Sequence, residues 1–155
     1  MTPLQETLYR RAFAKLSCRD MTPQGLYLWL MDAKEPVEPD LAKAVVRQLA
    51  AEGFLNQERS YQLLLAQAKN RLWGPRKLAQ ELKARHFSQA YHRRLAEEEI
   101  DFDQRARRLA RQLGAPGQDA AFPRRLYARL TARGYTGAQA AQACEYWQER
   151  TQQEE

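Results

Sequence analysis

The chain has 155 residues, with 24 Ala, 20 Leu, 19 Arg and 16 Gln against only 3 Val, 1 Ile and 6 Thr. Helices favour unbranched residues and strands favour β-branched ones, so this composition predicts an all-α fold and argues against enzymes built on a central sheet. The net charge is +6, and no apolar run approaches the length of a membrane span. Cys18 and Cys144 are expected to be buried like small hydrophobic residues, in a protein of the reducing cytoplasm.

A spacing of proline and leucine recurs along the chain. Pro23, Pro75 and Pro123 each precede one leucine by three residues and another by seven. Proline is tolerated in a first helical turn, and leucines at this spacing share one helix face. The sequence predicts nine helices, near residues 3–18, 23–33, 39–52, 57–72, 75–85, 89–98, 102–113, 120–133 and 137–150.

These helices group into three tandem three-helix repeats, expected to form an elongated, curved array. Repeat 1 spans residues 1–55, repeat 2 spans 56–99, and repeat 3 spans 100–150. The last residues, 151–155, are expected to be a frayed tail.

Local signals place the helix ends. Thr22 precedes Pro23 as an N-cap, and Thr136 with Gln139 predicts a capping box. Helices are expected to stop at Gly53, Gly114 and Gly134, with residues 114–117 as the clearest loop. The residues predicted to form the core are Leu8, Ala12, Leu16, Leu26, Leu30, Val45, Val46, Leu49, Tyr61, Leu64, Leu65, Ala68, Leu72, Leu78, Leu82, Phe87, Leu95, Phe102, Ala106, Leu109, Leu113, Leu126, Leu130, Tyr135, Ala140, Ala143 and Trp147. Trp29 and Trp73 could be core or interface.

No set of residues assembles catalytic chemistry. His86 and His92 are six residues apart and do not share a helix face as metal ligands would. The acids Glu97, Glu98, Glu99, Asp101 and Asp103 could bind a divalent metal, but their place at a helix junction favours a cap and spacer. We expect a binding protein with no catalytic residue, no metal and no cofactor.

Positive charge is concentrated in two blocks. Residues 66–95 and 105–134 each have a net charge of +7, and the acidic residues 96–104 between them have −5. Arg125, Arg129 and Arg133 are predicted to form one row on a helix face, away from Leu126 and Leu130. The candidate partner-binding residues are Arg71, Arg76, Lys77, Lys83, Arg107, Arg108, Arg111, Arg124, Arg125, Arg129 and Arg133. A solvated surface is the alternative for any one of them.

Several short motifs occur in a specific order. They are Gly53-Phe54-Leu55, Trp73-Gly74-Pro75, Leu78-Ala79-Gln80-Glu81-Leu82, Asp101-Phe102 before an Arg-rich helix, and Arg133-Gly134-Tyr135. In these motifs the sequence resembles the RecX family, bacterial modulators of the RecA recombinase. The resemblance covers nearly the whole chain and is weakest before about residue 38. The family's three tandem three-helix repeats agree with the repeats derived above.

The resemblance implies a protein that binds in the groove of a RecA–single-stranded DNA filament. It would inhibit ATP hydrolysis, strand exchange and coprotease activity. We expect it to be a cytoplasmic monomer. Separately, the two basic blocks predict weak DNA binding without sequence preference. Two departures stand out: Asn56-Gln57 replaces the family's Asp-Asp pair, and Gly25 lies in the first turn of a helix where the family carries Ser-x-x-Glu-Leu. Two other functions stay open: a nucleic-acid-binding module that acts without RecA, and a helical scaffold for another acidic protein.

Overall fold

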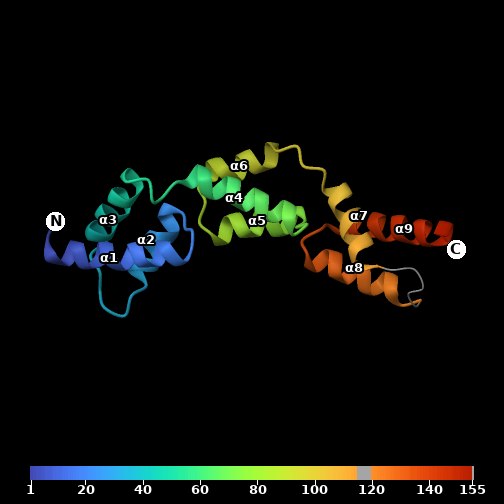
Figure 1. Ribbon diagram of the computed structural model, residues 1–155, viewed down its shortest axis with the longest axis horizontal. Helices are drawn as coiled ribbons and strands as arrows, with labels where there is room; N and C mark the ends of the chain where they lie inside the picture. Colours follow the sequence, from blue (N-terminus) through green and yellow to red (C-terminus); the bar gives the residue numbers. More distant parts are fainter. Residues whose placement is uncertain (115–119, 155) are drawn as a thin grey trace. The chain divides into compact units, whose positions relative to one another are not determined.

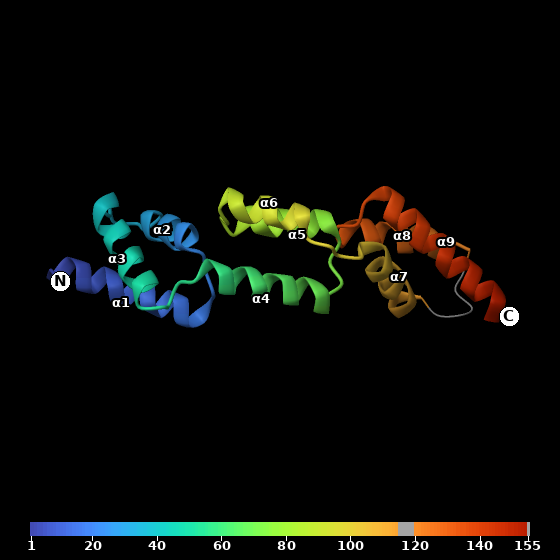
Figure 2. The same ribbon diagram turned by 90° about the horizontal axis from the view of Figure 1, so that it is seen from above.

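The computed structural model describes residues 1–114 and 120–154, and over these residues it contains nine α-helices and no strand (Figures 1 and 2). The all-α prediction is confirmed for this part of the chain. The helices are α1 (Pro3–Cys18), α2 (Pro23–Met31), α3 (Pro39–Ala51), α4 (Gln57–Asn70), α5 (Pro75–Ala84), α6 (Gln89–Glu97), α7 (Phe102–Leu113), α8 (Phe122–Ala132) and α9 (Gly137–Glu154). None of these described helices has both the length and the apolar character needed to cross a lipid bilayer.

Side-chain caps explain why the helices begin where the sequence predicts. Thr22 Oγ1 accepts a hydrogen bond from the Gly25 N–H at 3.1 Å, and Asn56 Oδ1 accepts one from the Arg59 N–H at 3.1 Å. At α9 the predicted capping box is present, with reciprocal bonds between Thr136 and Gln139 of 2.9 and 3.2 Å. Each cap satisfies an N–H group that has no partner within the helix.

Two helix boundaries in the last third differ from the prediction. Helix α8 begins at Phe122 rather than at residue 120, and residues 115–119, which include most of the predicted loop 114–117, lie outside the described residues. Helix α9 runs to Glu154, so residues 151–154 of the predicted frayed tail are helical, and residue 155 is not described. Thr151 Oγ1 donates to the Trp147 carbonyl at 2.8 Å, which ties this extension to the preceding turn.

Four helices end in the same way. After α3, α4, α5 and α8 a residue with positive φ is followed by an aromatic one: Gly53-Phe54, Leu72-Trp73, His86-Phe87 and Gly134-Tyr135. In each case the aromatic residue's N–H donates to the carbonyl five residues earlier. This is the Schellman arrangement. Two of the four positions hold Leu72 and His86 rather than glycine, and helix-stop rules based on glycine miss them.

The chain divides into two compact units. The first unit comprises residues 1–63 and 82–92, and the second comprises 64–81 and 93–155. The boundaries fall within α4, α5 and α6, so these units differ from the three predicted repeats. The arrangement as three tandem repeats therefore stays a prediction.

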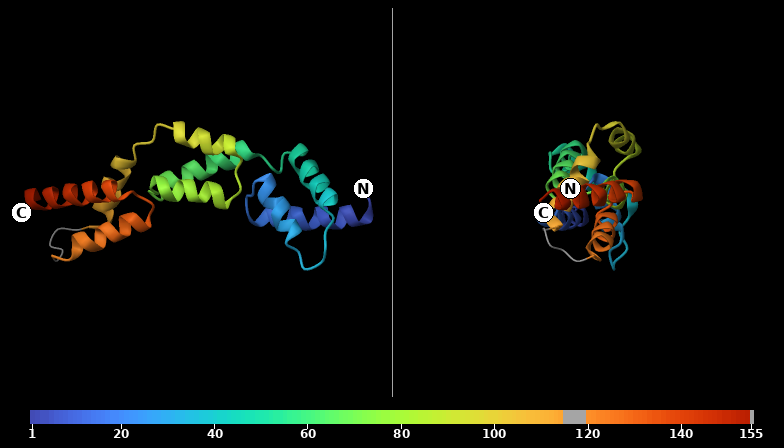
Figure 3. Two further views of the ribbon diagram at one scale, coloured as in Figure 1. Left: turned by 180° about the vertical axis from the view of Figure 1, so that it is seen from behind. Right: turned by 90° about the vertical axis from the view of Figure 1, so that its right-hand side faces the viewer.

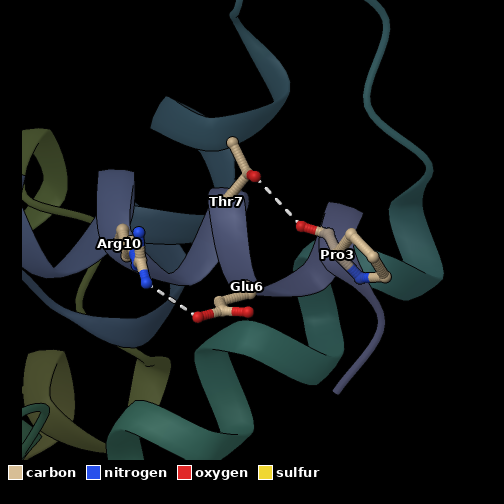
Figure 4. Close-up of polar contacts among 4 residues, drawn as sticks. All are labelled: Pro3, Glu6, Thr7 and Arg10. Atoms are coloured by element: carbon tan, nitrogen blue, oxygen red, sulfur yellow. Dashed lines mark hydrogen bonds and ion pairs between the residues drawn. The ribbon is translucent and has the colours of Figure 1, made fainter.

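In the first unit, α2 and α1 both pack against α3. The core contains Leu8, Ala12, Leu26, Leu30, Ala42, Val45, Val46, Leu49 and Leu55, with Leu16 and Trp29 partly buried against it. Thr22 Oγ1 also donates to the Arg85 carbonyl at 2.6 Å, which joins the start of α2 to the end of α5. On the exposed side of α1, Arg10 lies 2.8 Å from Glu6, and Thr7 donates to the Pro3 carbonyl (Figure 4).

In the second unit, helices α7, α8 and α9 all pack against one another (Figure 3, left). Their core contains Leu72, Ala106, Leu109, Ala110, Phe122, Leu126, Leu130, Tyr135, Ala140, Ala143 and Trp147, with Phe102 and Leu113 partly buried against it. Trp73 is 4% exposed and therefore lies in the interior. Cys144 is partly buried, but Cys18 is exposed, which contradicts its prediction as a buried residue.

The predicted core is largely confirmed. Tyr61, Leu64, Ala68, Leu78, Leu82 and Phe87 are buried as expected. Leu65 and Leu95 are only partly buried. The prediction missed Ala42, Leu55, Ala110 and Phe122, which are also buried.

Candidate binding surface

The start of α5 packs against the end of α8. The Gly74 N–H donates to the Arg133 carbonyl and the Arg76 N–H donates to the Gly134 carbonyl, each at 2.9 Å. The first N–H groups of a helix and its last carbonyls have no partners in their own helix, so here each helix end satisfies the other. The opposite ends of two helix dipoles also attract one another.

Side chains from the end of α8 reach the end of α4 as well. The Tyr135 hydroxyl, which is fully buried, donates to the Leu72 carbonyl at 2.6 Å. The Arg133 guanidinium donates to the Arg71 carbonyl. Burial raises the pKa of the Tyr135 hydroxyl to about 12, and the nearby charges of Arg105 and Arg133 oppose that rise.

Three basic side chains line one cleft at this junction. The cleft has a volume of about 390 Å³ and is lined by Lys77, Leu113, Arg129, Ala132 and Arg133. We call it the basic cleft. Lys77 comes from the first turns of α5, and Arg129 and Arg133 come from the last turn of α8, so the junction between these helices brings the three cations together. Lys77 Nζ also lies 5.1 Å from the centroid of the Trp73 ring, a cation–π contact.

The cleft suits an anionic group. Arg129 is exposed, and within the described residues its side chain makes no hydrogen bond or ion pair. Guanidinium groups bind phosphate or carboxylate oxygens through paired N–H donors, and a lysine ammonium adds a further donor. Leu113 and Ala132 supply apolar wall between these charges.

The other predicted arginines of the second unit are exposed. Arg107, Arg108 and Arg111 lie on α7, where Arg107 Cζ is 5.8 Å from the centroid of the Tyr146 ring. The remaining exposed members are Arg71, Arg76, Arg124 and Arg125. The second unit has 15 basic and 11 acidic side chains, a net charge of +4, so these arginines extend positive charge beyond the basic cleft.

Two of the predicted partner-binding residues, Arg133 and Lys83, differ from the rest. Arg133 was expected to continue the exposed row with Arg125 and Arg129, but it caps α8, is partly buried, and donates to a carbonyl. Its guanidinium therefore has a structural role besides lining the cleft. Lys83 is exposed but belongs to the first unit, unlike the residues of the basic cleft.

Sequence reasoning missed Arg105. It lies on the α7 face that includes Ala106 and Leu109, and its Nη1 atom is buried without a hydrogen-bond partner in the described chain. Burial lowers the pKa of Arg105, and its Cζ lies 5.6 Å from the Phe102 ring centroid. The sequence did contain a signal. Arg105 follows Phe102 by three residues and adjoins Ala106, which places it on the apolar side of an Arg-rich helix.

The acidic segment provides a cap. Asp101 Oδ1 accepts a hydrogen bond from the Gln104 N–H at 3.0 Å and so begins α7, which confirms the prediction of a cap. Over residues 1–114 and 120–154, no group of three or more His, Cys, Asp or Glu side chains is placed to hold a metal ion.

Comparison with known proteins does not assign the chain to a family. It matches no family model, and it has no significant match among curated proteins.

Proposed function

We propose that the chain is a RecX-like modulator of the RecA recombinase that binds in the groove of the RecA–single-stranded DNA filament. It acts without catalysis of its own, as a cytoplasmic monomer, and inhibits ATP hydrolysis, strand exchange and coprotease activity. The observation that carries the proposal is the basic cleft, because its three cations meet at a junction built by two of the motifs that carry the RecX resemblance, Trp73-Gly74-Pro75 and Arg133-Gly134-Tyr135.

A repeated junction supports the proposed tandem three-helix repeats. Thr22, which precedes Pro23, bonds to the carbonyl of Arg85, ten residues after Pro75. In the same way Gly74, which precedes Pro75, bonds to the carbonyl of Arg133, ten residues after Pro123. Each repeat would thus join the next at an equivalent position, through the Thr22 hydroxyl in one case and the Gly74 backbone N–H in the other.

The mechanism is steric and electrostatic. The cations of the basic cleft and the exposed arginines of α7 and α8 would meet phosphate oxygens of DNA or carboxylates on RecA, both of which carry the complementary charge. Occupying the filament groove would obstruct the DNA that must enter for strand exchange. Contacts of this kind weaken as salt is added.

The test is a RecA ATPase assay on single-stranded DNA with the protein added in increasing amounts. Inhibition that reaches a plateau at a fixed ratio of the protein to RecA supports the proposal, whereas an unchanged rate of ATP hydrolysis contradicts it. A different result would indicate the RecA-independent nucleic-acid-binding module instead. In that case the protein binds DNA equally tightly with and without RecA and does not change the RecA ATPase rate. ATP hydrolysis by the purified protein alone would contradict the absence of catalysis.

A further inference from the structure

A second cavity lies in the first unit, and only three of its lining residues, Ala84, Arg85 and His86, belong to a basic block of the sequence. It has a volume of about 450 Å³ and lies where the start of α2 meets the end of α5. Trp29 forms part of its wall. The complete lining is Arg19, Asp20, Met21, Thr22, Gly25, Leu28, Trp29, Asp32, Ala84, Arg85 and His86.

Trp29 differs from the other two tryptophans of the chain. Trp73 and Trp147 are 4% and 7% exposed, whereas Trp29 is only partly buried against the core of the first unit. Its neighbour Leu28, also in the cavity wall, is 38% exposed. An indole that is open to an accessible cavity can offer an aromatic surface to a ligand.

Cations contact Trp29 from outside this cavity. Arg11 Cζ lies 5.0 Å and Lys15 Nζ lies 5.2 Å from the ring centroid. These two residues lie one turn apart on α1, and neither lines the cavity. The indole that lines the cavity thus also lies close to two positive charges.

The charges in the cavity wall balance one another. The positive charges of Arg19 and Arg85 are offset by the negative charges of Asp20 and Asp32. The cavity wall therefore does not favour an anion as the basic cleft does. The wall carries four charged side chains, so a fully apolar ligand suits it poorly. A neutral, planar group with hydrogen-bonding edges fits such a wall better. A Cβ at Gly25, which also lines the cavity, would lie 3.0 Å from Thr22 Oγ1, a tight contact.

We propose that this cavity binds a nucleobase of single-stranded nucleic acid, which stacks on Trp29 while Arg11 and Lys15, which do not line the cavity, attract the adjoining phosphates. Aromatic platforms beside basic side chains are a common means of holding single strands without sequence preference. The proposal goes beyond RecA regulation, because it requires no filament and uses residues of the first unit, where the sequence analysis named only Lys83 as a candidate binding residue and left Trp29 open between core and interface.

The test is tryptophan fluorescence during titration with a thymidine oligonucleotide and with an abasic oligonucleotide of equal length. The thymidine strand should quench the emission, and the abasic strand, which has phosphates but no bases, should not. Trp29→Leu should abolish the quenching and weaken binding of the thymidine strand by roughly five- to a hundredfold. Trp29→Phe, which keeps a smaller ring, should bind with intermediate affinity.

Phe13→Leu provides the matched control, because Phe13 is an exposed aromatic residue of α1 in the same unit and does not line the cavity. It should leave quenching and affinity unchanged. Circular dichroism verifies that each variant keeps its helical content. Equal quenching by the abasic strand, or unchanged affinity in a folded Trp29→Leu variant, would overturn the proposal.

A protein ligand gives a different result. If Trp29→Leu weakens binding to RecA in the absence of DNA and leaves oligonucleotide binding intact, the cavity takes a protein side chain and the nucleobase proposal is wrong. Failure of the RecA ATPase test alone would leave the quenching result standing, so the two proposals are tested separately.

Discussion

Gly74 and Gly134 pack backbone against backbone, although they are far apart in the sequence. A Cβ on Gly74 would lie 2.3 Å from the carbonyl carbon of Gly134, and a Cβ on Gly134 would lie 2.4 Å from Lys77 Cβ. No side chain fits at either position while the hydrogen bonds between α5 and α8 are kept. This close approach also sets the position of Lys77 next to the last turn of α8, so it determines the shape of the basic cleft.

The first prediction separates crowding from backbone strain at these glycines. Gly134 has both a φ of +99° and a crowded Cβ position, Gly74 has only the crowding, and Gly53 has a φ of +86° with nothing within 4 Å. Gly53→Ala should cost about 1–2 kcal/mol, the usual penalty for a Cβ in the left-handed region. Gly134→Ala should cost more, and Gly74→Ala should also destabilise.

Urea and thermal unfolding followed by circular dichroism measure these differences. An effect of Gly134→Ala no larger than that of Gly53→Ala would show that the α5–α8 contact relaxes without cost.

The second prediction concerns the charge of the basic cleft. Lys77→Met with Arg129→Met removes two of its three cations and spares Arg133, which supports the fold. Hydrogen bonds to charged groups contribute roughly 1.5–3 kcal/mol each, so the double variant should bind the RecA–DNA filament on the order of a hundredfold more weakly or worse. If the ligand is phosphate, the slope of log affinity against log salt should fall by about 2.

The control is Lys43→Met with Arg47→Met, two exposed residues of α3 in the first unit, which lowers the net charge equally. Equal losses in both double variants would indicate that overall charge, and not the basic cleft, governs binding. A large loss in the cleft variant with an unchanged salt slope would favour carboxylates of RecA as its ligand.

The third prediction distinguishes two arginines at the end of α8. Arg133→Gln removes the guanidinium that donates to the Arg71 carbonyl and should lower the free energy of unfolding by about 1–3 kcal/mol. Arg129→Gln changes an exposed side chain and should shift the free energy of unfolding by less than about 0.5 kcal/mol. Chemical denaturation of both variants is the measurement. Equal stability would mean that the Arg133 contact contributes nothing.

The fourth prediction is a loss of stability at high pH. Tyr135 has a pKa of about 12 in the fold against an ordinary value of 10.0, so its neutral form is favoured by folding. Its contribution is fully present below pH 10 and is lost as the pH rises from about 10 to about 12. Tyr135→Phe should reduce this pH dependence, and should also cost about 1–3 kcal/mol at neutral pH because the Leu72 carbonyl loses its donor.

Unfolding of the wild type and of Tyr135→Phe at pH 8 and pH 11 tests this sign. Tyr9 also has a raised pKa, chiefly because its hydroxyl donates to Glu52, and it is unchanged in both proteins. The difference between them therefore reports on Tyr135. If the wild type exceeds Tyr135→Phe in free energy of unfolding by more at pH 11 than at pH 8, the prediction is wrong.

The local rules of helix formation account for what the sequence determined. Pro23 and Pro75 at first turns, the Thr136–Gln139 capping box and the leucines spaced along one face each act within a few residues, so helix starts and most buried positions could be predicted. Helix ends were less predictable, because Leu72 and His86 adopt positive φ at positions where glycine is expected.

Only the tertiary structure decided which of the arginines act together. The row Arg125, Arg129 and Arg133 follows from helical spacing, but that spacing contains no information about the Arg71 carbonyl that engages Arg133. Lys77 and Arg129 line one cleft because two helix ends satisfy each other's backbone groups. The Trp29 cavity lies where the Thr22 hydroxyl joins the start of α2 to the Arg85 carbonyl at the end of α5. Contacts between residues distant in sequence depend on how whole helices pack, and a periodic pattern within one helix cannot specify them.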